Sequence, residues 1–143
     1  VVKKRICGNR FEGTNIYKRG EYYYLFASIG TCCNGATSTY QTVVGRSKNV
    51  LGPYLDKTGR DMLYDYCEII MSGNETWAGP GHNSILIQDD VGTDWIIYHG
   101  YKKKEAENGR YVLMDKLIWS NDGWPSVKSN APSILEVAPY FQK

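Results

Sequence analysis

The chain has 143 residues, of which 42% are hydrophobic and 13% aromatic, which is enough for one domain with a folded core. Its formal net charge of +2 is too small for the field of a nucleic-acid-binding or membrane-surface protein, so we expect neither partner. No apolar run approaches the ~18 residues of a membrane span. Residues 1–5 lack an apolar signal core, which indicates a cytosolic chain or one already trimmed of its leader.

Short aromatic and β-branched runs alternate with Gly, Asn, Asp and Pro along nearly the whole chain, and helical periodicity is almost absent. This pattern predicts an all-β meander. We expect a first set of strands at about residues 13–18, 22–29, 39–47 and 54–57, and a second set at about 83–89, 94–101, 111–119 and 125–128. Residues 58–80 predict a long connecting loop that helps to wall a site. The tail, residues 131–137, is a candidate for a further strand.

The two sets of strands resemble each other in sequence at an offset of about 70 residues, as in a β-repeat protein. Each set begins with a polar or ionisable cluster and continues into an aromatic strand. In a radial β array such as a propeller, the innermost strands line one central axis. We therefore expect a single domain, residues 1–143, with blade-like units at about 12–57 and 81–128, in which Glu12 and His82 face a shared cavity.

The four cysteines are too few for a disulfide scaffold in a domain of this size, and their spacing matches no zinc-binding pattern. We favour small buried side chains beside a loop as their role. Two alternatives remain open: a vicinal disulfide between Cys32 and Cys33, or a bridge from Cys7 to Cys67.

The succession of motifs resembles a known enzyme family. It consists of the segments EGTNIYKRGEYYYLFASIGTCCNGATSTYQTVVGRSKNVLGPY, GPGHNSIL, DWIIYHGY and GRYVLMDKLIWSNDGWPSV. In order and spacing, over about residues 10–127, they are similar to the C-terminal half of a glycoside hydrolase family 43 enzyme, and the endo-arabinanase and arabinofuranosidase branch fits best. The resemblance implies a partial β-propeller, with about two four-stranded antiparallel blades of a five-bladed ring. It also implies inverting hydrolysis of arabinan or of other plant polysaccharides that contain arabinose or xylose.

The resemblance implies a role for several residues. Glu12 matches the general acid, which protonates the departing glycosidic oxygen and which burial keeps protonated near neutral pH. His82 matches an axial histidine beside a metal, usually calcium with a water-completed shell. Because calcium prefers oxygen ligands, the alternative is a histidine that only orients a carboxylate or a water.

Arg110 matches an arginine that reaches the site in some relatives, with an exposed hairpin arginine as the alternative. Arg46 is expected to tie one blade to its neighbour. The residues expected to border the sugar subsites are Ser28, Cys32, Cys33 and Tyr40.

Inverting hydrolysis also needs a second carboxylate as general base, about 6.5–9.5 Å from the acid. In the family, this base and a third aspartate lie on earlier blades, and no segment of this chain resembles either of them. Two blades alone also leave apolar flanks open to water. We therefore expect the partners to be an oligo- or polysaccharide substrate and either a missing N-terminal half or further copies in a homo-oligomer. The alternative is a noncatalytic carbohydrate-binding fragment.

Overall fold

The computed structural model describes residues 3–142, and its regular structure is almost entirely antiparallel β-strand. The first sheet is a meander in which each strand pairs with the next along the chain. Its strands are β1 (Glu12–Arg19), β2 (Tyr22–Ile29), β3 (Gln41–Ser47) and β4 (Glu68–Met71). Within the described part of the chain, no helix is long and apolar enough to cross a membrane.

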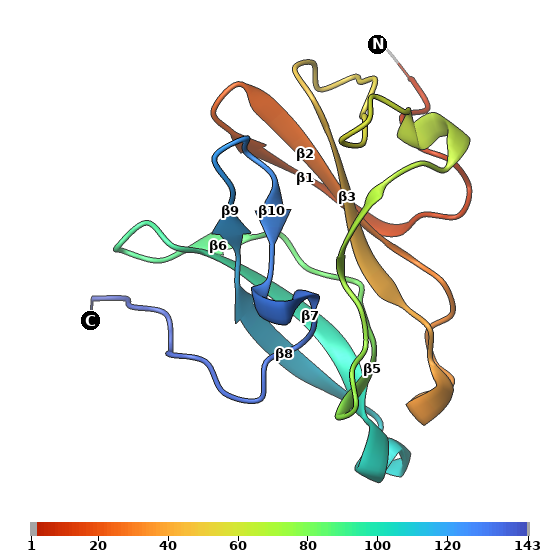
Figure 1. The fold of residues 1–143 in the computed structure, drawn as a ribbon, viewed down its shortest axis with the longest axis vertical. Helices are drawn as coiled ribbons and strands as arrows, with labels where there is room; N and C mark the ends of the chain where they lie inside the picture. Colours follow the sequence, from red (N-terminus) through yellow and green to blue (C-terminus); the bar gives the residue numbers. More distant parts are fainter. Residues whose placement is uncertain (1–2, 143) are drawn as a thin grey trace.

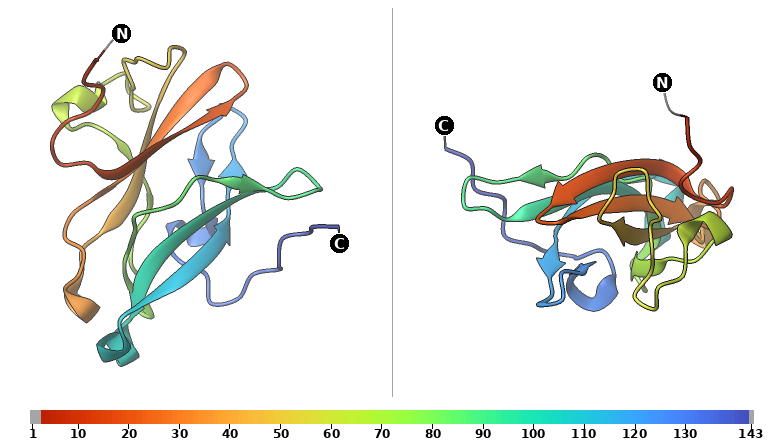
Figure 2. Two further views of the ribbon diagram at one scale, coloured as in Figure 1. Left: turned by 180° about the vertical axis from the view of Figure 1, so that it is seen from behind. Right: turned by 90° about the horizontal axis from the view of Figure 1, so that it is seen from above.

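The second sheet is built around β7 (Asp94–Lys102). One edge of β7 pairs with β5 (Trp77–Gly81) and then with β6 (Ile87–Gln88), and the other edge pairs with β8 (Arg110–Lys116). The chain continues into a small hairpin of β9 (Ile118–Trp119) and β10 (Pro125–Ser126). Four 3-10 turns complete the structure: η1 (Gly35–Thr37), η2 (Met62–Tyr64), η3 (Lys103–Asn108) and η4 (Lys128–Asn130). Figures 1 and 2 show the two sheets side by side, with β5 running between β3 and β7.

The all-β prediction is confirmed, but the first sheet takes its fourth strand from a different place than expected. Residues 54–57 form only isolated bridges, from Leu55 to Arg46 and Asp61. The fourth strand is β4, and β4 and all but the last residue of β5 lie inside the segment 58–80 that was expected to be a loop. Both strands are short, and β5 contains Gly and Pro, which are typical of loops and turns.

The expected strand at residues 131–137 is also absent from the described structure. Pro132 removes a backbone donor from this stretch, and Pro139 removes another just after it. Carboxylates hold the tail instead: Asp115 accepts a hydrogen bond from the backbone nitrogen of Ser133 at 3.2 Å, and Asp89 accepts one from that of Tyr140 at 3.3 Å. The tail therefore lies on the second sheet without extending it.

The main core lies between the two sheets, and β2 is buried on both of its faces. Tyr24 and Phe26 point into the inter-sheet cluster, while Leu25 and Ala27 pack on the opposite face of the sheet. The inter-sheet cluster is formed by Tyr24, Phe26, Val44, Ile70, Met71, Leu86, Ile96, Tyr98, Leu117, Trp124 and Val127. Its members come from both sheets and from the β9-β10 hairpin, so the apolar core joins them.

Arg46 also ties the two units together, as the sequence predicts. Its guanidinium lies 4.2 Å from the ring centroid of Tyr22 and 4.3 Å from that of Trp124, and it donates to the carbonyl of Asp122 at 2.6 Å. Such a cation between two aromatic faces is stabilised by their quadrupoles. The same side chains line a hollow of about 470 Å³, which shares no residue with the candidate site described below.

A buried carboxylate makes a second link between the sheets. Asp94, on β7, accepts hydrogen bonds from the hydroxyl of Tyr17 at 2.7 Å and from the indole nitrogen of Trp119 at 2.8 Å. Burial, and then this hydrogen bond to the Asp94 carboxylate, raise the pKa of Tyr17 to about 12, so Tyr17 acts as a neutral donor. Tyr17 lies on β1, so the bond connects the first sheet to the second.

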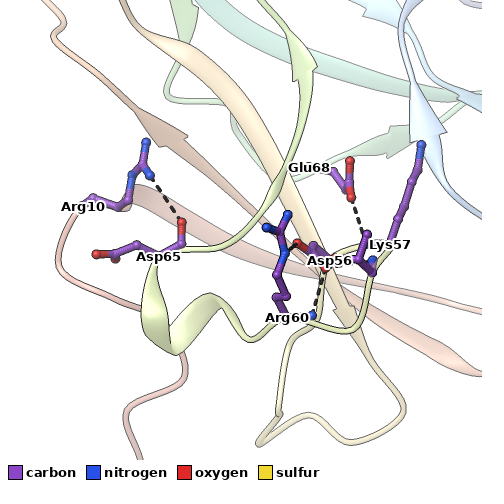
Figure 3. A network of polar contacts seen from close by, with 7 residues as sticks. Arg10, Asp56, Lys57, Arg60, Asp65 and Glu68 are labelled. Carbon is purple, nitrogen blue, oxygen red and sulfur yellow. Dashed lines mark hydrogen bonds and ion pairs between the residues drawn. The ribbon is translucent and has the colours of Figure 1, made fainter.

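The loop that covers the outer face of the first sheet is organised by Asp56 (Figure 3). Its carboxylate accepts from the backbone nitrogens of Thr58 and Arg60, from the Thr58 hydroxyl, and from Nε of Arg60 at 2.8 Å. Burial alone would raise the pKa of Asp56, but the hydrogen bonds from Arg60 and Thr58 outweigh it and lower the pKa. Nearby, Arg10 donates to the carbonyl of Asp65.

This network predicts a pH-dependent cost for Asp56→Asn. Because the folded-state pKa lies below the unfolded value of about 3.9, the carboxylate stabilises the fold above that pH, and the stabilisation is lost as the pH falls through the folded-state pKa. We expect the variant to lose about 1–3 kcal/mol of unfolding free energy at pH 7 and to approach the parent chain in acid. Urea unfolding at several pH values measures this. An equal loss at every pH contradicts the role of the charge.

Candidate active site

Glu12 and His82 meet where β1, β2 and β5 come together. Glu12 opens β1 and pairs with Ser28 across to β2. The Ser28 hydroxyl accepts a hydrogen bond from the backbone nitrogen of His82 at 2.7 Å. The His82 ring lies against Gly13: a Cβ added there would be 3.0 Å from Cδ2 of His82. Two residues that are about 70 positions apart are thus brought near each other through Ser28 and Gly13, although Glu12 is not among the residues that line the hollow at His82.

Three of the expected site residues differ in accessibility from the prediction. Ser28 was expected to border a sugar subsite, but it is fully buried and holds the backbone of His82 instead. Glu12 itself is exposed, so the burial expected of a general acid is not provided by the described residues. Tyr40 is only 1% exposed. Ser28 and Tyr40 therefore support the site from beneath.

Tyr40 holds the candidate acid. Its hydroxyl donates a hydrogen bond of 2.6 Å to Oε2 of Glu12. Burial, and then this bond to the Glu12 carboxylate, raise the pKa of Tyr40 above its ordinary value, which keeps the phenol neutral. The tight packing of Tyr40 requires glycine at position 81, since a Cβ there would be 2.4 Å from Cδ2 of Tyr40. One carboxylate oxygen of Glu12 is thus fixed by a neutral donor.

His99 is a member of this cluster that the sequence analysis missed. Its ring is nearly parallel to those of Tyr40 and His82, with ring centroids 6.0 Å and 6.1 Å away. Burial, then Arg110 and then His82 lower the pKa of His99. His99 pairs with Gly81 in the β5-β7 ladder, next to His82. The chain contains two histidines, and both lie here; that scarcity is the signal that could have found the second.

Arg110 reaches the same cluster from the start of β8. Its Nη1 atom lies 3.5 Å from Nε2 of His99 and 3.8 Å from Sγ of Cys33. The side chain is exposed and contacts a cysteine of the loop after β2 and a histidine of β7, so a role of Arg110 toward sugar stays a prediction. The cluster now contains a carboxyl group, a guanidinium and two imidazoles.

The cysteine prediction is wrong for one pair. Cys32 and Cys33 form a vicinal disulfide, and Cys33 adopts a φ of +71° in an exposed loop, so neither is a simple buried side chain. Cys7 and Cys67 are free, half-buried thiols packed against the outer core, as the favoured interpretation expects. Burial raises the pKa of both thiols.

The surroundings of His82 offer little to a calcium ion. His82 lines a shallow hollow of about 400 Å³ together with Asn15 and Asn83. Among residues 3–142, no group of three or more His, Cys, Asp and Glu side chains is placed to hold a metal. The Oδ1 atoms of Asn15 and Asn83 lack hydrogen-bond partners, but they are buried rather than open to the hollow. Because calcium takes six to eight oxygen ligands, these residues alone do not fit it.

Comparison with known families gives one strong match. The model of the Glycosyl hydrolases family 43 matches residues 4–125. Over 118 residues the chain is 45% identical to the extracellular exo-α-(1→5)-L-arabinofuranosidase of Cellvibrio japonicus, covering 82% of this chain and 33% of that protein. Over 120 residues it is 41% identical to the extracellular endo-α-(1→5)-L-arabinanase 1 of Bacillus subtilis, covering 83% of this chain and 35% of that protein. The chain thus spans about a third of the length of these curated relatives.

Solved structures give the same result for the fold. A Cellvibrio cellulosa α-L-arabinanase in complex with arabinohexaose superposes with a TM-score of 0.78 at 44% identity, covering 84% of this chain and 37% of that one. An endo-arabinanase from Bacillus licheniformis gives a TM-score of 0.74 at 35% identity, covering 88% and 41%. Such arabinanases are five-bladed β-propellers, so the two sheets form part of a propeller ring.

Proposed function

Because the chain belongs to glycosyl hydrolases family 43, we propose that it is the acid-bearing part of a glycosidase that hydrolyses arabinan with inversion, with Glu12 as the general acid. The observation that carries this proposal is the hydrogen bond between Tyr40 and Glu12, within a cluster that also contains His82, His99 and Arg110. An isolated surface carboxylate would not be held in this way.

The cluster assigns different tasks to its residues. Glu12 protonates the glycosidic oxygen as the bond to the sugar breaks. Tyr40 occupies Oε2 of Glu12, which leaves Oε1 free to carry and deliver the proton. The exposed Arg110 lies 3.8 Å from Cys33, whose partner Cys32 is half-buried. In this proposal these residues contact the hydroxyls and ring carbons of the sugar. The guanidinium carries five donors and suits this polar contact.

The general base comes from outside these 143 residues. Inversion requires a second carboxylate about 6.5–9.5 Å from the acid, and Glu12 is the carboxylate that the described hydrogen bonds place in the cluster. Either an N-terminal half or a second copy of this chain supplies the base and covers the exposed Glu12. In a two-fold dimer, each Glu12 would serve as base to the acid of the other copy.

Calcium beside His82 stays a prediction. His82 offers one imidazole nitrogen, so water and groups beyond the described residues would complete the shell. No proton transfer by Glu12 depends on the ion.

The proposal is tested by measuring the mass of the chain in solution and its hydrolysis of linear and debranched arabinan, alone and mixed with the N-terminal two thirds of a relative. We expect turnover only in an assembled form, either the mixture or an oligomer of this chain. Binding of arabinan without turnover in every form would identify a noncatalytic carbohydrate-binding fragment and overturn the proposal. Turnover of xylan but not arabinan would correct the substrate.

A further inference from the structure

The bond between Cys32 and Cys33 lies in the loop that connects β2 to β3. The base of this loop is already closed by hydrogen bonds. Thr31 accepts from the backbone nitrogen of Thr39 at 2.9 Å, and the Thr39 hydroxyl accepts from that of Thr31 at 2.9 Å. A disulfide stabilises a fold by shortening the loops of the unfolded chain, and two adjacent residues enclose almost none. The disulfide therefore adds little to global stability, and its effect is local.

Packing also fixes this loop against the second sheet. Ser38 is buried under Gly79, where a Cβ on the glycine would lie 2.6 Å from Cβ of Ser38. At its tip, Gly35 faces Ala106 of η3, with 3.5 Å between an added Cβ on the glycine and Cβ of the alanine. Figures 1 and 2 show η1 and η3 together at one end of the molecule. These contacts fix the loop that carries the disulfide against the second sheet.

Arg110, at the start of β8 in the second sheet, lies against the disulfide. Nη1 of Arg110 lies 3.8 Å from Sγ of Cys33 and 3.5 Å from Nε2 of His99, so the guanidinium is held between a sulfur and an imidazole. Fixing an exposed arginine costs the rotamer freedom of its long side chain, so a contact that orders it must offset that loss. Cys33 keeps its sulfur in this place through its left-handed backbone, with φ of +71°, which a side-chain-bearing residue seldom adopts.

We infer that the Cys32–Cys33 disulfide is a positioning element that holds Arg110 beside His99 at the rim of the site, and that its reduction frees the arginine and weakens sugar binding without unfolding the chain. The sugar-binding part rests on the proposed function. In the reduction, a dithiol supplies two electrons and two protons: the sulfur–sulfur bond breaks, Cys32 and Cys33 become thiols, and the dithiol closes into its own cyclic disulfide.

The first test needs no sugar. Nuclear magnetic resonance of the Nε–Hε group of Arg110 and of the His99 ring is recorded on the oxidised chain, after dithiothreitol, and on a C32S/C33S variant. We expect reduction and the variant to move the Arg110 resonance to the position of free arginine and to shift that of His99, while resonances of the inter-sheet core stay in place. A C7S/C67S variant is the matched control, and it should respond to dithiothreitol like the parent chain.

Two results of this test would overturn the inference. Arg110 and His99 resonances that do not change on reduction would show that the disulfide does not position them. Loss of spectral dispersion throughout the chain would show that the bond supports the fold as a whole.

The second test measures arabinotriose binding by calorimetry in both redox forms. We expect at least an approximately tenfold weaker affinity after reduction, which corresponds to one lost hydrogen bond from a charged donor. Equal affinity in the two forms would contradict the link to sugar binding. If neither form binds arabinotriose while Arg110 still responds to reduction, the positioning role stands and arabinan binding by this chain is contradicted.

Discussion

Glu12→Gln is expected to reduce the hydrolysis of arabinan by the assembled enzyme by about 10²- to 10⁴-fold, the usual contribution of a general acid. The amide has the size of the carboxyl group, and its Oε1 still accepts the hydrogen bond from Tyr40, so binding of the substrate should change little. The loss should therefore fall on kcat rather than on KM. Steady-state kinetics on debranched arabinan measure both constants.

Two controls make this result specific. Glu21→Gln changes an exposed carboxylate that is paired with Lys48 only at 3.8 Å, and it should leave the rate unchanged. An aryl arabinofuranoside with an acidic phenol as leaving group needs little protonation, so it should recover most of the activity of the Glu12 variant. Full activity of the Glu12 variant on arabinan would mean that another group is the acid.

Phe26→Ala is expected to lower the unfolding free energy of the 143-residue chain by about 3–5 kcal/mol, the cost of removing a buried phenylalanine. Phe26 is fully buried on β2, between Asn15 of β1 and Val44 of β3, and it faces the cluster between the two sheets. The cavity would lie where β2 supports the whole inter-sheet core. Chemical denaturation followed by tryptophan fluorescence measures the loss.

Val112→Ala is the matched control for this measurement. Val112 is an apolar strand residue on β8, but it is 80% exposed, so its truncation should change stability by less than about 0.5 kcal/mol. Similar losses of unfolding free energy in the two variants would contradict a core between the sheets. They would indicate that the two sheets can separate without either sheet unfolding.

Much of the architecture follows from local patterns in the sequence. The alternation of aromatic runs with glycine and asparagine predicts the strands from neighbouring residues, and the repeat at an offset of about 70 residues predicts that Glu12 and His82 lie near each other. The short strands β4 and β5 escape this reasoning. The ladder between β3 and β4 contains a register shift at Thr42, and β5 includes a glycine and a proline at its centre. Tertiary pairing, not propensity, makes both of them strands.

The candidate site shows the same limit. His99 is fixed beside His82 only by the pairing of β7 with β5, which no local pattern reveals. Ser28 and Tyr40 were expected to border the sugar subsites, but both are buried, since accessibility depends on how the sheets pack. The disulfide between Cys32 and Cys33 and the left-handed backbone of Cys33 belong to the folded loop, which the count and spacing of the cysteines do not reveal.

The residues around Glu12 are divided between two sheets: Tyr40 belongs to the first, while His82 and Arg110 belong to the second. The alignment of the acid with its neighbours is therefore only as accurate as the angle between the blades. Asp94 and Arg46 join the two units by hydrogen bonds outside this cluster. We therefore expect substitutions of Asp94 or Arg46 to slow turnover by the assembled enzyme before they unfold the chain. Residues far from Glu12 would then be constrained by catalysis as well as by folding.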